Sequence, residues 1–548
     1  MGGRQRILSV ALAVCALLCV LSARAFASDT ESSVMIDDNQ LIYSTTSHTI
    51  SVLEQMKDLG VDDVKVSVVW SLIAPDPNSR HEPNFDATDP AAYPAGAWAR
   101  YDLIAREAAK LGMGVYFQLQ GPDPAWAREA GPSQGPALGH YPYPTDWKQF
   151  VEAVGERYNG SYVTGSGSSS PSSTGQPISV LGIPLTLGSS TPSSDPSTAI
   201  PRVSNWEIWN EPNERSWLNP WYRTKGRRKL YTQPLEYRNI ADEAWSALQS
   251  TGHAGDTILL GETANQGVLD PIPFVRDLYC VGSNNLPLHG GAASAVGCPT
   301  AGAPSSFVAA NPGLFDASGY AHHPYAFDVA PNRAYPQHYF VTLQNLSSFE
   351  RLLTQIYAGY GRYPAGGVPI YLTEWGYESN PPNPFVHTSL SQQETYLNEG
   401  EYMTWQDPYV RTLAQFELVD DGPKPNTTPG TRAYWSTFQT GLEFSNGTHK
   451  PSYDAWEVPI WVPRARHGSN VTVWAQLRPA GHSTVQYAIL QYAQGNSTNY
   501  RTLQEVSTTS SEGFLVTHAS IPAAGSVRIA FLDPYTGDVT YSRTVTIS

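Results

Sequence analysis

Charged side chains are scarce in this chain of 548 residues, and basic ones are the scarcer kind. Asp, Glu, Lys and Arg make up 15% of the sequence, against roughly 25% in an average soluble protein. The 34 Lys and Arg residues face 49 Asp and Glu residues, so the formal net charge is −15. Phosphate contacts need a basic face, so this balance argues against nucleic-acid binding. Aromatic residues reach 11%, which excludes disorder over most of the length.

Long apolar runs are also missing, apart from one at the N-terminus. This run, at 7–21, has 15 residues, fewer than the roughly 20 that a membrane-spanning helix needs. Arg4 and Arg6 precede it, and the small-x-small sequence Ala-Phe-Ala follows at 25–27. This is the pattern of a secretory signal peptide. We therefore expect residues 1–27 to be removed on secretion, which leaves an extracellular protein with no membrane segment.

Cysteine is nearly absent, with four residues in all. Cys15 and Cys19 lie in the expected signal peptide, so Cys280 and Cys298 remain, 18 positions apart. Two cysteines in an exported chain predict one disulfide that closes a loop. No His or Asp stands at ligand spacing from them, which argues against a metal site.

Short β-branched runs alternate with longer helical patterns over most of the chain. The helical patterns lie at 50–59, 101–111, 147–158 and 235–249. The predicted strands number eight and lie at 35–43, 63–70, 114–119, 203–209, 257–261, 315–321, 368–373 and 410–416. Alternation of this kind predicts parallel βαβ units. Eight units close into a (β/α)8 TIM barrel at 28–456, and a doubly wound sheet is the alternative.

The C-terminal region has a different pattern, with short strands of alternating polarity between Gly, Pro, Asn and Ser turns. They lie at 470–478, 484–492, 501–507, 513–521, 526–533 and 539–547. We expect a small all-β sandwich at 462–548 that supports the barrel, because Trp461 and Trp474 fit a linker and a strand core; glycan binding is the alternative. A Ser/Pro/Gly-rich insertion at about 160–200 follows a helix and precedes a strand, which assigns it to the barrel rim opposite the chemistry.

Two glutamates stand at the predicted C-terminal ends of barrel strands. Glu211 follows the fourth strand within Trp-Asn-Glu-Pro, and Glu374 ends the seventh within Thr-Glu-Trp-Gly. Strands four and seven of a closed barrel face each other across its mouth. Paired carboxylates across a cleft are what glycoside cleavage requires, because one protonates the leaving oxygen while the other attacks or activates water.

The sequences around both glutamates resemble the acid/base and nucleophile motifs of the clan A glycoside hydrolases, above all the cellulase-like families 5 and 39. The resemblance extends over about residues 35–456. It implies that Glu211 is the proton donor and acceptor and that Glu374 is the nucleophile. It also assigns Asn210 to the sugar 2-hydroxyl and Trp375 to the floor on which the sugar stacks.

The same resemblance places His323 and Tyr325, from Ala-His-His-Pro-Tyr at the sixth strand, beside the nucleophile. Lys65 stands where the clan has an Arg that pairs with the nucleophile. Lys cannot form the bidentate fork of Arg, so either Lys65 supplies a point charge near Glu374 or the charge comes from elsewhere.

Three further residues are candidates on position and residue type alone. Trp70 and Trp126 are candidate stacking surfaces for a pyranose ring, with core packing as the alternative, equally weighted for Trp70. Glu262 ends the fifth strand and is a candidate contact of the substrate or of the acid/base.

The sequence thus predicts a secreted retaining glycoside hydrolase of carbohydrate substrates that uses no metal or organic cofactor. A carbohydrate-binding protein on an inherited barrel and a transglycosylase with the same two glutamates are the alternatives. The sugar, the linkage and the oligomeric state are left open.

Overall fold

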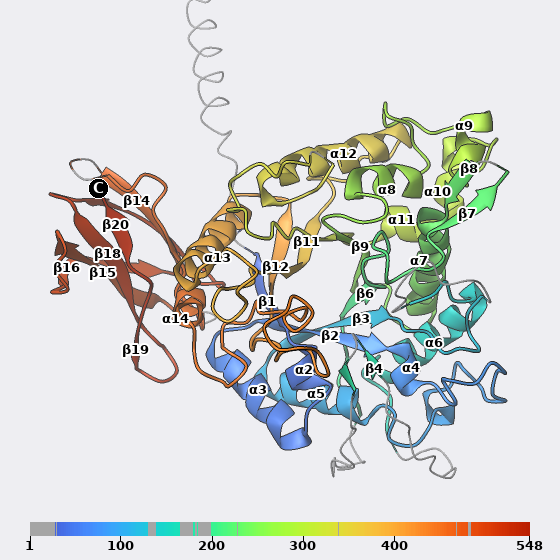
Figure 1. Cartoon of the computed structure of the whole chain (residues 1–548), viewed down its shortest axis with the longest axis horizontal. Coiled ribbons are helices and arrows are strands. Elements are labelled where there is room, and N and C mark those ends of the chain that lie inside the picture. The colour runs from blue at the N-terminus through green and yellow to red at the C-terminus, as the bar shows by residue number, and fades with distance from the viewer. Residues whose placement is uncertain are drawn as a thin grey trace, which may run out of the picture.

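The computed structural model describes residues 28–548 except 29, 130–138, 165–178, 181–182, 185–198, 227, 338, 467, 469 and 481–483. The predicted signal peptide and most of the predicted insertion at 160–200 lie outside the described residues. Figure 1 shows two parts, a large barrel and, at the left, a smaller all-β part that ends the chain.

Eight parallel strands close the barrel. They are β1 (Ser32–Ile36), β2 (Asp63–Val69), β3 (Gly114–Gln120), β6 (Asn205–Ile208), β9 (Thr257–Ala264), β10 (Gly319–His323), β11 (Ile370–Trp375) and β12 (Val410–Phe416). They follow one another around the barrel in chain order, and β12 pairs with β1. The fold is therefore the predicted TIM barrel and not a doubly wound sheet, whose edge strands stay open.

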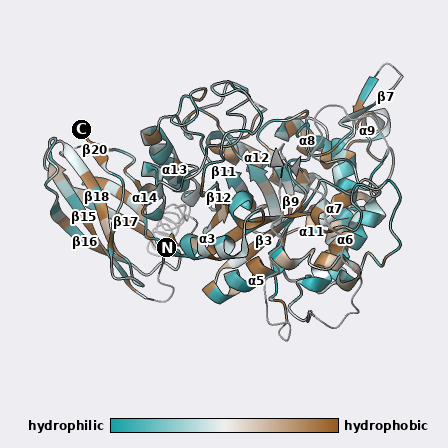
Figure 2. Ribbon diagram, turned by 60° about the horizontal axis from the view of Figure 1, so that its bottom comes forward, coloured by the Kyte–Doolittle hydropathy of each residue, from teal (hydrophilic) through white to brown (hydrophobic). Residues whose placement is uncertain are grey.

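Helices surround the strands, and Figure 2 shows hydrophilic and hydrophobic residues side by side along them, as expected where one face covers the barrel. Six of these helices carry Pro in the first turn, where its missing N–H costs nothing. The helices are α2 (Asp38–Leu41), α3 (Thr46–Asp58), α4 (Trp70–Ile73), α5 (Ala99–Leu111), α6 (Pro144–Arg157), α7 (Gln233–Ser250), α8 (Pro271–Leu278), α9 (Gly290–Ala295), α10 (Pro304–Ala310), α11 (Pro312–Asp316), α12 (Leu346–Gly359), α13 (Leu390–Trp405) and α14 (Pro451–Glu457).

Short elements complete the barrel part. Two 3-10 turns are η1 (Pro90–Ala92) and η2 (Leu343–Asn345), and two small hairpins pair β4 (Ser179–Val180) with β5 (Ile183–Pro184) and β7 (Tyr222–Lys225) with β8 (Arg228–Tyr231). None of the helices that the structure describes is long and apolar enough to cross a membrane.

Two predicted strands were misplaced. The first strand is 32–36 and not 35–43, because the Asp37 side chain accepts the Gln40 N–H and starts α2. The sixth strand is 319–323 and not 315–321, because Pro312 opens α11, which occupies 312–316. Residues 37–43 therefore lie beyond the C-terminal end of the first strand. The sixth strand extends two residues further than predicted, to His323.

The C-terminal part consists of two antiparallel sheets and confirms the predicted all-β fold. Its strands are β13 (Ile460–Trp461), β14 (Asn470–Gln476), β15 (Gln486–Gln494), β16 (Arg501–Thr508), β17 (Phe514–Ser520), β18 (Gly525–Leu532), β19 (Val539–Tyr541) and β20 (Val545–Ile547). One sheet has the order β13-β14-β17, and the other has β16-β15-β18-β19 with β20 also on β18. The predicted last strand is thus two strands, β19 and β20.

An aromatic cluster joins this part to the barrel, where Figure 1 shows it against α13 and α14. Tyr402 and Trp405 of α13 pack against Trp474, and Tyr402 also stacks with Trp461. Arg478 adds a buried ion pair to Glu401 of α13 at 2.8 Å. Both predicted tryptophans therefore face the barrel rather than an open glycan-binding surface.

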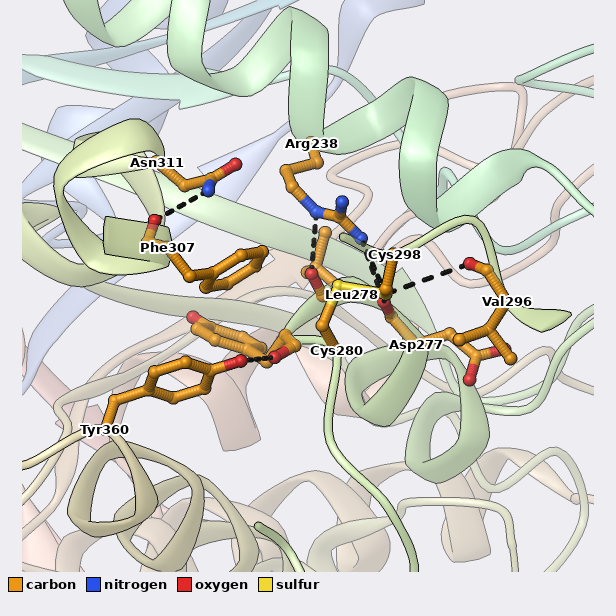
Figure 3. Close-up of a disulfide and its surroundings, with 10 residues drawn as sticks. Arg238, Asp277, Leu278, Cys280, Val296, Cys298, Phe307, Asn311 and Tyr360 are labelled. Carbon is orange, nitrogen blue, oxygen red and sulfur yellow. Dashed lines mark hydrogen bonds between the residues drawn. A yellow bond between two sulfur atoms is a disulfide. The ribbon is translucent and has the colours of Figure 1, made fainter. Parts of the chain in front are cut away.

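The predicted disulfide joins Cys280 and Cys298, with Cα atoms 5.7 Å apart. Cys280 lies two residues after the end of α8, and Figure 3 shows Arg238 of α7 beside the disulfide, donating from Nε to the Leu278 carbonyl at 2.9 Å. Neither cysteine lines the cavity at the barrel mouth.

Candidate active site

Glu211 and Glu374 both lie at the carboxyl ends of barrel strands. Glu374 belongs to β11, and Glu211 lies three residues beyond β6. The backbone between β6 and Glu211 is left-handed at Trp209, with φ 69°, and at Glu211 itself, with φ 38°. Such angles strain residues other than glycine, persist only where the surroundings enforce them, and cluster at functional sites.

Hydrogen bonds fix the loop that carries Glu211. Oδ1 of Asn213 accepts the N–H of Ala264 at 2.9 Å, and its Nδ2 donates to the Gln266 carbonyl at 3.2 Å. Trp209 donates its backbone N–H to Leu119 of β3 at 2.7 Å. The loop after β6 is thus held between β3 and the loop after β9.

The two glutamates meet at His323 of β10. One carboxylate oxygen of Glu211, one of Glu374 and a ring nitrogen of His323 all lie within 4.8 Å of one another. The Glu211 side chain is 19% exposed and that of Glu374 is 12% exposed, while His323 is fully buried. Both carboxylates are therefore accessible from the cavity and yet largely shielded from water.

His323 contacts three carboxylates. Its Nδ1 lies 3.0 Å from Glu211 and 3.5 Å from Glu374, and its Nε2 lies 3.0 Å from Glu262. Burial alone would lower the pKa of His323, but the charge of Glu374 and the hydrogen bonds to Glu211 and Glu262 raise it to about 10. His323 therefore connects the two cavity glutamates to the buried Glu262.

Lys65 of β2 lies beneath Glu374 and is fully buried. Its Nζ is 2.9 Å from Glu207, 3.3 Å from Glu262 and 3.4 Å from Glu374. Burial opposes the ammonium charge, but the three carboxylates outweigh it and raise the pKa of Lys65. The point charge predicted for Lys65 is thus present beside Glu374, without the fork of an Arg.

Glu262 lies inside the barrel and not on the cavity wall. It is fully buried and accepts hydrogen bonds at 3.1 Å from Thr373 Oγ1 and Gln118 Nε2. Burial favours its neutral form, but Lys65 and His323 outweigh burial and lower the pKa of Glu262. It therefore contacts Glu211 only through His323, and it has no position from which to touch a substrate.

Tyr325 and Asn210 line the cavity beside the glutamates. The Tyr325 hydroxyl donates to Glu374 Oε2 at 3.3 Å. Oδ1 of Asn210 accepts from Gln118 Nε2 at 3.0 Å, which leaves its amide nitrogen for a ligand. Burial raises the pKa of Glu211, and the charge of Glu374 adds to this, while His323 opposes it.

A cavity of about 440 Å³ opens at this end of the barrel, a size that suits a small ligand. Its wall combines carboxyl groups with aromatic rings. The rings are Tyr43, Trp217, Tyr325, Phe327, Phe416 and Phe438, of which Phe327 is 46% and Phe438 38% exposed. Exposed rings at the mouth can stack on the C–H face of a sugar.

The three tryptophans predicted as stacking surfaces lie elsewhere. Trp70 is 1% exposed and stacks on Phe150, with ring centroids 5.0 Å apart, and Trp126 packs edge-on against it. Trp375 is 2% exposed and lies so close to Gly400 of α13 that a Cβ there would come within 2.1 Å of its ring. All three are core residues outside the cavity wall, so the predicted stacking role was wrong.

Several residues of the site were not predicted from the sequence. Glu207 and Gln118 are buried polar side chains: Glu207 pairs with Lys65, and Gln118 donates to Glu262. Phe327 and Phe438 of the cavity wall lie in loops with no motif. For Glu207 a signal exists: it is a carboxyl group within an apolar strand, as Lys65 is an ammonium within one. Burial and the charge of Glu262 raise the pKa of Glu207 to about 8, while Lys65 opposes them.

No family model matches the chain, and no curated protein matches it. Solved structures similar to it include a monomeric beta-xylosidase from Caulobacter crescentus CB15, with 12% identity over 90% of this chain and 94% of that one, at a TM-score of 0.46. A GH5_18 protein from Streptomyces cattleya, in complex with Manb1-4GlcNAc, is 13% identical over 78% and 79%, at 0.44. A family 1 b-glucosidase from Thermotoga maritima is 13% identical over 75% and 86%, at 0.41. All three are named as or numbered among glycosidases, and each is only distantly similar to the chain.

Proposed function

We propose that the protein is a retaining glycoside hydrolase in which Glu374 is the nucleophile and Glu211 the acid/base. The observation that carries the proposal is the approach of one carboxylate oxygen of Glu211 to within 4.8 Å of one of Glu374 at the barrel mouth. Retaining glycosidases hold their two carboxyl groups about 5–5.5 Å apart, and inverting ones about 6.5–9.5 Å apart to admit a water.

The surroundings of Glu374 hold its carboxyl group in place for attack. Lys65 supplies positive charge at 3.4 Å from one oxygen, and the Tyr325 hydroxyl donates to the other at 3.3 Å. Both contacts fix the side chain in the cavity wall. Glu374 then attacks the anomeric carbon and forms a covalent glycosyl ester.

The surroundings of Glu211 suit the proton donor. Burial and the nearby charge of Glu374 raise its pKa, so the acid stays protonated until the leaving oxygen takes the proton. Formation of the ester removes the charge of Glu374, which lowers the proton affinity of Glu211. Glu211 is therefore ionised in the intermediate and takes a proton from the incoming water. The water oxygen bonds to the anomeric carbon as the ester bond to Glu374 breaks, which restores both glutamates for the next cycle.

We also propose that the protein acts outside the cell on a carbohydrate. The disulfide fits an oxidising compartment, and the N-terminal sequence fits a signal peptide. The cavity joins aromatic rings to hydrogen-bonding groups, which matches a ligand with apolar C–H faces and hydroxyl edges.

The test is hydrolysis of aryl glycosides and polysaccharides by purified residues 28–548 and two variants. We expect Glu374→Ala to lose turnover and Glu211→Ala to lose about 10²–10⁴-fold in kcat/KM. Glu54→Ala, an exposed glutamate on α3, is the matched control and keeps full activity.

Azide separates the two roles. With Glu374→Ala it attacks in place of the missing nucleophile and gives a glycosyl azide of inverted configuration. With Glu211→Ala it intercepts the glycosyl ester and gives an azide of retained configuration. A retained azide from Glu374→Ala and an inverted azide from Glu211→Ala would reverse the two roles. Full activity of both folded variants would refute the proposal.

A further inference from the structure

Glu417 is a buried carboxyl group that faces the cavity and that the mechanism above does not use. It follows β12 directly, is 4% exposed and belongs to the cavity wall. Its Oε2 is buried without a hydrogen-bond partner among the residues that the structure describes. Buried carboxyl oxygens normally have donors, so a donor from a ligand in the cavity would complete this one.

The acidic neighbours of Glu417 each have partners of their own. Asp37 accepts from the N–H groups of Gln40 and Val419. Asp421 accepts from the Phe438 N–H at 3.1 Å, and Asp420 pairs with Lys450. Burial raises the pKa of Glu417 well above its usual range, and the charges of Asp421, Asp37 and Asp420 add to this. A carboxyl group in this state can both donate to and accept from a hydroxyl.

Glu417 lies at the same end of the cavity as Glu374. Strands β11 and β12 are neighbours in the barrel, and Trp375 is in register with Gln415. Tyr325 connects the two residues: its hydroxyl donates to Glu374, its ring meets Phe416 edge-on, and its pKa is raised by burial and by the charges of Glu374, Glu211 and Glu417. Glu374 and Glu417 therefore both border the cavity around Tyr325.

The cavity wall also restricts the charge of that sugar. Besides the two glutamates at its centre, Asp38, Glu214, Asp328, Glu378, Glu417 and Asp421 line it. The described residues of this wall include no Lys or Arg. A uronic acid or a sulfated sugar would meet carboxyl groups and no cation, whereas hydroxyl groups would meet acceptors.

We propose that Glu417 is a specificity-determining residue that binds one or two adjacent hydroxyl groups of an uncharged sugar in the unit next to Glu374. This inference rests on the proposed function for the orientation of the sugar. The claim that Glu417 binds the hydroxyl groups of an uncharged ligand can be tested by binding measurements alone.

The experiment is titration calorimetry of the full chain with methyl α- and β-glycosides of glucose, galactose, mannose, xylose and glucuronic acid. The tightest binder is then replaced by its analogues that each lack one hydroxyl. We expect Glu417→Ala to weaken binding of the parent glycoside about 10- to 100-fold, as for a hydrogen bond to a carboxyl group. Glu417→Gln, which keeps the shape and one donor, recovers part of the loss, and Glu54→Ala binds as the unaltered chain does.

The deoxy analogues distinguish contact from mere structural damage. Loss of one hydroxyl, or of either of two adjacent hydroxyls, should weaken binding of the glycoside to the unaltered chain. The same loss should not weaken binding to Glu417→Ala any further. Equal penalties in both proteins, or tighter binding of the glucuronide than of every neutral glycoside, would overturn the inference, as would absence of binding by all of them. Binding with this pattern but without any turnover would uphold Glu417 and refute hydrolysis.

Discussion

Lys65 on β2 places its ammonium group 3.4 Å from Oε1 of Glu374 on β11, although 309 positions separate the two residues in the chain. The contact crosses the inside of the barrel, where Lys65 also meets Glu207 and Glu262. Lys65 thus shares the balancing of these buried carboxyl groups with His323, which contacts Glu262 and Glu374 as well. Removal of Lys65 leaves Glu207 without its cation and weakens the compensation of the other two away from water.

Lys65→Met should destabilise the protein by about 3–5 kcal/mol, the usual cost of removing one partner of a buried ion pair. Activity should fall as well, because Glu374 loses the contact at 3.4 Å that holds one of its oxygens. Urea unfolding and kcat/KM measure the two effects. Lys110→Met is the control, since Lys110 is 67% exposed in its pair with Glu107 and should contribute about 0–1 kcal/mol. Equal losses in both variants would contradict this account of Lys65.

His323→Gln should shift the basic limb of the activity profile to higher pH. Glu211 must be protonated to act as the acid, so activity falls as pH rises through its pKa. The His323 charge and hydrogen bond oppose the burial that raises the pKa of Glu211, and a neutral Gln removes that charge. The measurement is kcat/KM against pH for both proteins. A limb that stays in place or moves to lower pH would show that His323 does not set this pKa.

The stabilisation by His323 should also depend on pH. Its pKa is raised to about 10 in the folded protein, above the usual 6.5, so its contribution is complete below about pH 6.5 and disappears as pH rises to 10. The difference in unfolding free energy between the unaltered chain and His323→Gln should therefore shrink, by on the order of a few kcal/mol, between pH 6 and pH 10. Urea unfolding at both pH values measures it, and a constant difference would contradict the raised pKa.

Substitution of aromatic residues at the mouth should change KM, whereas substitution of those in the core should change stability. Phe438→Ala and Phe327→Ala remove exposed rings of the cavity wall and should raise KM about 2- to 10-fold with little change in stability. Trp70→Ala should cost about 3–5 kcal/mol of stability and leave KM unchanged in the folded fraction. A raised KM in Trp70→Ala alone would restore the stacking role that its burial argues against.

The sandwich should unfold together with the barrel. Arg478 follows β14 and bonds to Glu401 of α13, to the Trp456 carbonyl and to Ser33 of β1, all buried. Arg478→Ala should therefore lower the stability of the whole chain by about 3–5 kcal/mol within a single calorimetric transition. Arg501→Ala, exposed on β16, serves as the control and should stay within about 0.5 kcal/mol. Separate transitions for barrel and sandwich would contradict a supporting role.

The barrel and the position of its two glutamates were predictable because both depend on local pattern. Short β-branched and apolar stretches such as β2 and β3 mark buried strands even though each carries polar side chains, and chain order then places their C-terminal ends at one rim. The β1 boundary was mispredicted because Asp37 caps a helix within an apolar stretch, and the sixth strand because a short helix precedes it.

Side-chain direction was not predictable in the same way. A Trp in the sequence indicates apolar surroundings, but whether its ring meets a cavity or a helix depends on neighbours such as Phe150 and Gly400. The partners of Lys65 depend on strand register across the barrel, which a motif does not give. The role of Glu417 became visible only because its oxygen is buried without a partner beside the cavity.

The configuration of the first product tests the central claim most directly. Proton NMR of the best substrate, recorded within the first minutes of hydrolysis, shows which anomer of the free sugar appears before mutarotation. The account predicts the anomer of the same configuration as the substrate, and no product from Glu374→Ala. Release of the opposite anomer would contradict Glu374 as the nucleophile and with it the covalent mechanism.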